Sequence, residues 1–176
     1  MIGASLANPT RLIFGVFGDL AFFYDMNVLG NRHVGNNVRL MLINNGCGAE
    51  FRLSVHLCEK NFGDEADPYM AAAGHFGNKS PQLIKHYAED LGYEYLTASS
   101  KEEFKQVMER FVTPEITDRP MLFEVFTDKQ DESDALEMLL NMKSDSGTVL
   151  KKNLRKVAGQ VLGGKGVETL KTILKK

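Results

Sequence analysis

Apolar residues gather in four short runs whose spacing predicts the core of the fold. The runs cover residues 11–17 (RLIFGVF), 38–43 (VRLMLI), 93–97 and 120–127 (PMLFEVFT). The first two are rich in branched or aromatic residues and are apolar at nearly every position. This pattern is typical of strands that are buried on both faces of a parallel sheet.

Stretches with helical spacing separate these runs. In residues 21–29, Phe22, Met26 and Leu29 share one helical face, and Gly30 is a suitable stop. Residues 81–91 and 101–112 are predicted to form further helices. Strands that alternate with helices predict an α/β fold with three layers, in which a doubly wound parallel sheet carries helices on both faces.

Two segments do not follow this alternation. Residues 46–80 hold five glycines among polar and small residues, and long irregular connections of this kind are often functional. After the last strand, an acidic stretch at 131–134 is followed by apolar residues and a basic tail. We therefore expect a domain over 1–130 and a C-terminal helical extension over 131–176, whose amphipathic helices pack on the protein or on a partner.

Composition narrows the possible functions. Of the 176 residues, 43% are hydrophobic and 25% are charged, a balance typical of a folded globular protein rather than a disordered one. The net charge of -2 argues against a dedicated nucleic-acid-binding protein. No apolar run approaches the ~20 residues that a membrane span needs, and the first residues do not resemble a signal peptide, so we expect a cytoplasmic protein without membrane contacts.

Two predicted strands end in residues that suggest a ligand site. Gly18 and Asp19 follow the first strand, and Asn44 and Asn45 follow the second, with 25 residues between Asp19 and Asn45. Ligands of open parallel sheets bind beyond the carboxyl ends of the strands. A diphosphate suits the glycine and the helix start at the first end, but the Asp19 carboxylate would repel it unless a divalent cation lay between them.

Magnesium prefers about six oxygen ligands. The Asp19 carboxylate, the Asn45 amide oxygen, a carbonyl near Cys47, two phosphate oxygens and one water would supply them. Either pair alone also fits a structural role, because aspartate is a common N-cap and Asn-Asn-Gly is a good turn sequence. Their presence at successive strand ends favours the metal-diphosphate site.

Other motifs in the sequence give weaker signals. Cys47, Cys58 and His56 lack the paired spacing of a zinc site. The glycines at 159–166 nearly match a phosphate-binding loop, but Gly166 stands where Ser or Thr is needed. His75 is a candidate for contact with substrate or an ordinary loop histidine, and Asp25 is expected to cap a helix or pair elsewhere.

The two strand-end motifs together resemble the signature of thiamine diphosphate enzymes, in their diphosphate-binding domain. The stretches 18–27 (GDLAFFYDMN) and 44–51 (NNGCGAEF) look most like the menaquinone-pathway synthase that adds a decarboxylated 2-oxoglutarate unit to isochorismate (SEPHCHC synthase), and more distantly like acetolactate synthase. Cys47 and Glu50 depart from the glycine-rich, apolar version of the second motif, so the resemblance is specific for the cofactor and weak for the substrate.

The resemblance implies roles for particular residues. It implies that Mg²⁺ is held by the Asp19 and Asn45 side chains and the Cys47 carbonyl, and that thiamine diphosphate is bound by a set comprising Gly18, Asp19, Leu20, Ala21, Asn45, Cys47 and Gly48. No catalytic residue is assigned, because these enzymes activate the cofactor with a glutamate from a separate pyrimidine-binding domain.

The resemblance also implies a partner. We expect a domain or subunit of a 2-oxo acid decarboxylase or carboligase, truncated at its N-terminus or encoded separately, that forms a homo- or hetero-oligomer and is inactive alone. The alternative is a noncatalytic Rossmann-like module that binds another phosphate ligand at the same edge.

Overall fold

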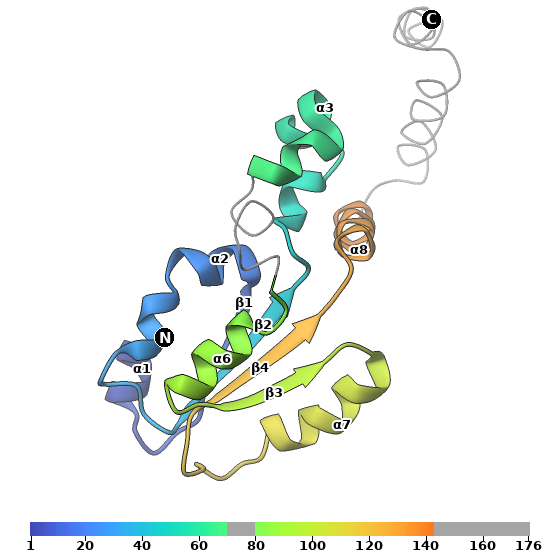
Figure 1. Ribbon diagram of the computed structural model, residues 1–176. Coiled ribbons are helices and arrows are strands. Elements are labelled where there is room, and N and C mark those ends of the chain that lie inside the picture. Colours follow the sequence, from blue (N-terminus) through green and yellow to red (C-terminus); the bar gives the residue numbers. More distant parts are fainter. Residues whose placement is uncertain (70–79, 143–176) are drawn as a thin grey trace, which may run out of the picture. The chain divides into compact units, whose positions relative to one another are not determined.

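The computed structural model describes residues 1–69 and 80–142 (Figure 1). The chain divides into two compact units, Met1–Asp134 and Ala135–Lys176. His75, the glycines at 159–166 and the basic tail lie outside the described residues, and the boundary expected at residue 130 stays a prediction. Within the described ranges, no helix is long and apolar enough to cross a membrane.

A parallel sheet of four strands forms the centre of the first unit. The strands are β1 (Ile13–Gly18), β2 (Val38–Asn44), β3 (Glu94–Ala98) and β4 (Met121–Phe126), and their order in the sheet is β1-β2-β4-β3. All pairs are parallel. The four predicted strands are therefore confirmed, with ends shifted by one or two residues.

One face of the sheet is covered by α2 (Asp19–Tyr24), the 3-10 helix η1 (Met26–Gly30) and α6 (Leu83–Asp90) (Figure 1). Alternate residues of the central strands point to this side because side chains alternate between the faces of a strand. The core on this face consists of Phe22, Leu29, Val38, Leu40, Leu42, Ile84, Ala88, Tyr93 and Leu122.

The opposite face carries α7 (Lys101–Phe111). Ser100 caps this helix by accepting a hydrogen bond of 3.2 Å from the backbone N–H of Glu103. The core here consists of Met41, Ala98, Phe111, Met121, Phe123 and Val125. Helices on both faces confirm the predicted doubly wound α/β fold with three layers.

The first strand differs from the prediction that it is buried on both faces. β1 lies at an edge of the sheet, and Phe14 and Val16 are 48% and 67% exposed. Phe14 makes an edge-on ring contact with Phe111, with centroids 5.6 Å apart. β1 is therefore apolar but only partly buried by the described residues.

The helix predicted over 21–29 also differs. α2 ends at Tyr24, Asp25 leaves the helical conformation with φ -136° and ψ 33°, and the chain continues as η1. Phe22 and Leu29 both belong to the core on the sheet, although they lie on two separate helical segments.

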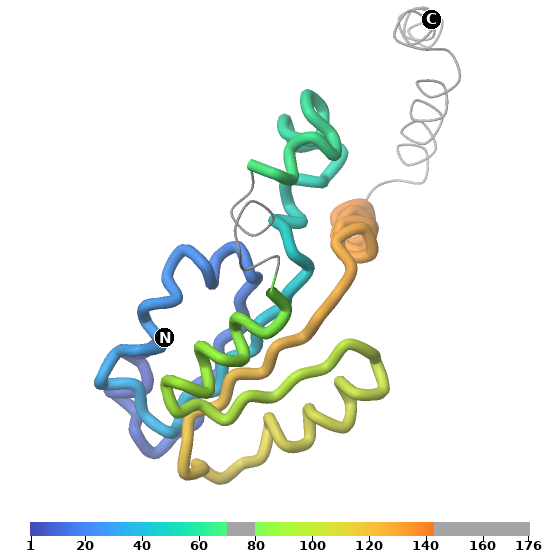
Figure 2. The backbone as a smooth tube through the Cα atoms, viewed as in Figure 1, coloured from blue at the N-terminus to red at the C-terminus, as the bar shows by residue number. Residues whose placement is uncertain are grey.

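The remaining helices are short or terminal. α1 (Ile2–Ala7) precedes the sheet, and α8 (Lys129–Asn141) follows β4. Between β2 and α6, where an irregular connection was predicted, the backbone forms η2 (Ala49–Arg52), α3 (Leu57–Phe62) and η3 (Gly63–Tyr69) (Figure 2).

A test of this core is the substitution Leu122→Ala. Leu122 is fully buried, so we expect a loss of about 2–5 kcal/mol in the free energy of unfolding, measured by urea denaturation. Leu57→Ala is the matched control, because Leu57 is 69% exposed and its loss should change stability by less than about 1 kcal/mol. Equal effects of the two substitutions would contradict this description of the core.

Candidate functional site

Asp19 stands at the carboxyl end of β1. It is the first residue of α2, and the N-cap of that helix is Gly18, which makes no side-chain cap. The interpretation of Asp19 as an N-cap is therefore wrong. The Asp19 side chain is only 1% exposed, which is unusual for a carboxylate at the end of a strand.

Burial dominates the electrostatics of Asp19. Loss of water raises the pKa of its carboxyl group from 3.8 to about 6, against the lowering effect of hydrogen bonds from the backbone N–H groups of Leu20, Gly46 and Asp19 itself. The nearby charge of Glu132 raises the pKa further. The Oδ2 atom is buried and has no hydrogen-bond partner among the described residues.

The contact with Gly46 brings the two predicted strand ends together. β1 and β2 are neighbours in register, with Gly18 opposite Ile43, so Asp19 and the loop after Asn44 leave the sheet at the same edge. Asp19 also affects the pKa of Cys47 through its charge, which places the two residues close to each other.

The loop over residues 44–47 consists of two successive side-chain turns. The backbone N–H of Gly46 donates to Asn44 Oδ1 at 3.2 Å, and the N–H of Cys47 donates to Asn45 Oδ1 at 2.9 Å. Gly46 has a φ of 76°, which favours glycine because other residues are strained there. The turn role predicted for Asn-Asn-Gly is thus real, and it leaves the second lone pair of Asn45 Oδ1 as a possible ligand.

Two glutamates hold the amide groups of this loop. Asn44 Nδ2 donates to Glu124 Oε1 at 2.7 Å, and Asn45 Nδ2 donates to Glu132 Oε2 at 2.6 Å. The hydroxyl of Tyr95 donates to the other oxygen of Glu124 at 2.6 Å. Burial raises the pKa of Glu124, while these two donors act in the opposite direction.

The sequence analysis missed both glutamates. Glu124 had a visible signal, since it is a charged residue in the middle of the apolar run at 120–127. Glu132 had none, because it is one of several acidic residues at the predicted helix start. Its role depends on a contact between residues that are 87 positions apart in the chain.

Cys47 and Gly48 complete the turn beside α2. Cys47 is buried, and burial raises the pKa of its thiol to about 11, so the thiol stays protonated and only the backbone carbonyl is suited to a hard cation. A Cβ at Gly48 would lie 2.8 Å from Leu20 Cδ2 and 2.6 Å from the ring of Phe51, so a larger residue here would require these side chains to shift. By contrast, a Cβ at Gly18 would meet nothing within 4 Å, which leaves that backbone open to a ligand.

The alternative metal site is not supported. His56 is the N-cap of α3, and its Nδ1 accepts a hydrogen bond of 3.1 Å from the backbone N–H of Cys58. Among residues 1–69 and 80–142, no group of three or more His, Cys, Asp or Glu side chains could hold a metal ion. The predicted magnesium ligands would not form such a group. They combine a single carboxylate with one amide oxygen and one backbone carbonyl oxygen.

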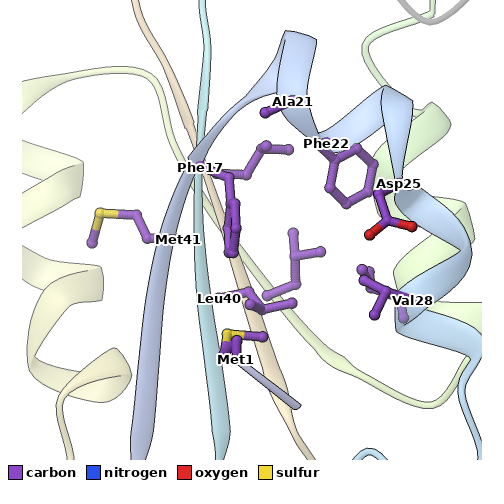
Figure 3. Close-up of a pocket in the computed structure, with 11 residues that line it drawn as sticks. Met1, Phe17, Ala21, Phe22, Asp25, Val28, Leu40 and Met41 are labelled. Atoms are coloured by element: carbon purple, nitrogen blue, oxygen red, sulfur yellow. The ribbon is translucent and has the colours of Figure 1, made fainter. Parts of the chain in front are cut away.

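Two cavities lie near these elements without including Asp19 or Asn45. The first, of about 70 Å³, lies between the sheet and α2 and η1, with Phe17, Phe22 and Leu40 among its lining residues and Asp25 beside it (Figure 3). Sites for cofactor-sized ligands typically enclose about 300–1,000 Å³, so this cavity is too small for one. The second, of about 650 Å³, is a polar groove at the carboxyl end of β3, where Tyr95, Thr97 and Phe126 face α6.

The residues present fit a magnesium ion. Asp19 supplies a buried carboxylate oxygen that has no partner in the described part of the chain. Asn45 supplies an amide oxygen, and the amino end of the same amide is fixed on Glu132. Oxygen ligands of this kind, completed by phosphate and water, are those that Mg²⁺ prefers. The structure brings Asp19 together with the loop that carries Asn45, Cys47 and Gly48. The roles of Gly18, Leu20 and Ala21 toward a diphosphate stay predictions.

Most of the chain matches a known protein family. Residues 1–125 match the family model described as "Thiamine pyrophosphate enzyme, C-terminal TPP binding domain". The match covers β1 to β4 almost to the last residue of the sheet, and it includes both strand-end motifs.

Two similar proteins of known name are both the same synthase. The chain is similar to the 2-succinyl-5-enolpyruvyl-6-hydroxy-3-cyclohexene-1-carboxylate synthase of Phocaeicola vulgatus, at 36% identity over 133 residues, which is 74% of this chain and 22% of that protein. It is also similar to the synthase of the same name from Bacteroides fragilis, at 33% identity over 136 residues, 77% of this chain and 23% of that protein. The chain thus spans less than a quarter of the length of these relatives.

These matches confirm the resemblance that the two motifs indicated. The family model names thiamine pyrophosphate, which is another name for thiamine diphosphate, as the ligand of this domain. The chain belongs to the thiamine pyrophosphate enzyme family and carries its C-terminal cofactor-binding domain.

Proposed function

We propose that this domain binds thiamine diphosphate through Mg²⁺ and serves a decarboxylase or carboligase that acts on a 2-oxo acid. The observation that carries the proposal is the buried Asp19 carboxylate, whose Oδ2 has no partner within residues 1–69 and 80–142 and which lies against the Asn44–Cys47 loop. A divalent cation would supply the missing partner and would compensate the loss of hydration.

Different residues would bind the metal and the diphosphate. The Asp19 carboxylate, Asn45 Oδ1 and the Cys47 carbonyl would hold the cation. The backbone at Gly18, Leu20, Ala21 and Gly48 would face the diphosphate, and the open space at Gly18 supports this arrangement. Bound thiamine diphosphate supplies the carbanion chemistry, so the domain's own task is to hold and orient it.

Catalysis would need a second, pyrimidine-binding domain. The relatives are synthases more than four times as long as the matched region, which leaves ample chain in those proteins for further domains. Their name is compatible with a carboligase, since it describes a synthase of a succinyl-substituted cyclohexene carboxylate. The donor and acceptor proposed here are therefore defined only by class, and the assembly would be a homo- or hetero-oligomer.

Removal of the proposed carboxylate ligand tests the cofactor site. We expect Asp19→Ala to weaken Mg²⁺-dependent binding of thiamine diphosphate by at least about a hundredfold, because a ligand charge is lost from a buried position. Calorimetry on the chain, alone and joined with its pyrimidine-binding partner, measures the effect. Asp25→Ala is the control, since Asp25 is an exposed aspartate at the other end of α2. Unchanged binding by Asp19→Ala would overturn the proposed site.

Turnover tests the need for a partner. We expect the purified chain, supplied with thiamine diphosphate and Mg²⁺, to release no CO₂ from 2-oxoglutarate or pyruvate above the rate without protein. Addition of the pyrimidine-binding polypeptide should restore release. Decarboxylation by the chain alone would contradict this part of the proposal.

The pKa of Asp19 predicts a cost in stability that a cation would offset. The folded-state pKa of about 6 lies above the ordinary value of 3.8, so the folded state holds the proton more tightly and stability falls as the pH rises from about 4 to 6. In metal-free buffer at pH 7, Asp19→Asn should therefore raise the free energy of unfolding by up to about 3 kcal/mol. The gain should shrink to a small remainder near pH 4 and vanish below it, because the unfolded chain then also takes up the proton.

Urea denaturation of the two proteins at pH 4 and pH 7 measures this difference. Asp25→Asn, a matched substitution at an exposed position, is again the control. A stability gain that is the same at both pH values would show that burial of the Asp19 charge is not its cause.

A further inference from the structure

Glu132 contacts the proposed site although it lies outside both motifs. It belongs to the first turn of α8, in the unit that contains the sheet. Its Oε2 accepts a hydrogen bond of 2.6 Å from Asn45 Nδ2, and its Oε1 accepts one from the hydroxyl of Thr127. The backbone N–H of Thr127 in turn donates to the carbonyl of Asn44 at 3.0 Å. Glu132 is thus fixed on two residues that follow adjacent strands.

The contact determines which way the Asn45 amide points. An ionised carboxylate can only accept hydrogen bonds, so the amino end of the amide must face Glu132. The opposite orientation would place Asn45 Oδ1 against Glu132 Oε2 and would also break its 2.9 Å bond with the N–H of Cys47. The amide oxygen therefore faces the loop that lies beside Asp19.

The first turn of α8, within the unit that contains the sheet, is not held by Glu132 alone. Ser133, the next residue, donates its hydroxyl to the carbonyls of Lys129 at 2.8 Å and Ala49 at 3.3 Å. Gln130 and Asp131 donate their backbone N–H groups to Asp128 Oδ1 at the start of the helix. The helix start thus keeps several contacts when the Glu132 carboxylate is replaced.

We propose that Glu132 is a positioning residue for the cation: it fixes the Asn45 amide with Oδ1 toward the metal and adds a negative charge behind it. This inference rests on the proposed function, because it assigns Asn45 Oδ1 to the bound cation. Residues that hydrogen-bond to a metal ligand commonly affect metal affinity about 10–100-fold.

Three substitutions separate positioning from charge and from a general effect on the helix. Glu132→Gln keeps the size of the side chain but removes the charge and lets the Asn45 amide take either orientation. Glu132→Asp keeps the charge but shortens the side chain by one methylene, so it no longer reaches Asn45 in the same way. Asp131→Asn removes one charge from the same turn at an exposed position and is the control.

The first measurement is the Kd of Mg²⁺ at saturating thiamine diphosphate, obtained by calorimetry on the chain joined with its pyrimidine-binding partner. We expect Glu132→Gln and Glu132→Asp to raise this Kd by about tenfold or more, and Asp131→Asn to change it by less than about twofold. If Glu132→Asp binds Mg²⁺ as tightly as the unaltered protein does, the charge of residue 132 alone matters and the positioning role is overturned. An equal loss in Asp131→Asn would overturn a specific role of Glu132.

The second measurement needs neither metal nor cofactor. In ¹⁵N-resolved NMR spectra of the full chain, the side-chain NH₂ resonances of Asn45 should shift in Glu132→Gln and stay unchanged in Asp131→Asn. If they do not shift in Glu132→Gln, Glu132 does not hold the amide and the inference is overturned. If the unaltered protein binds no thiamine diphosphate with Mg²⁺, the proposed function fails, whereas the Asn45 resonances still decide whether Glu132 holds the amide.

Discussion

A carboxylate taken out of water at the end of a strand is the constraint on which this site depends. Asp19 is buried, one of its oxygens has no partner among the described residues, and its pKa is raised to about 6. A buried charge of this kind lowers the stability of the domain near neutral pH. Residues held in such an unfavourable state cluster at functional sites, because the energy is recovered when the ligand binds.

The surroundings of Asp19 hold the neighbouring loop rigidly. Asn44 and Asn45 each close a turn with their amide oxygen and donate their amino group to a glutamate. Glu124 connects this arrangement to Tyr95 on the edge strand β3, so the loop is supported from the interior of the sheet. A site held by supporting hydrogen bonds loses little freedom when it binds a ligand. The turn role and the proposed ligand role of the Asn-Asn-Gly sequence are therefore compatible.

Much of the fold could be predicted from local patterns. The four strands and the helices α6 and α7 were predicted. Apolar runs and helical spacing show which side of a segment is buried, and this does not depend on which other segment it packs against. The break in the helix at Asp25 was not predicted, since the apolar spacing continues through it. The exposure of β1 was missed for a similar reason, because an apolar run does not reveal whether its strand lies in the centre or at the edge of a sheet.

The sequence by itself determined where the strands end and which oxygen-bearing side chains stand there, and the two motifs were enough to indicate the family. Only the tertiary structure decided the order of the strands, the burial of Asp19 and the orientation of the two amides. These depend on contacts between distant residues: Asn44 with Glu124 across 80 positions, and Asn45 with Glu132 across 87. Such contacts leave no periodicity in the chain, because each is a single pair that forms only when the sheet places its strand ends together.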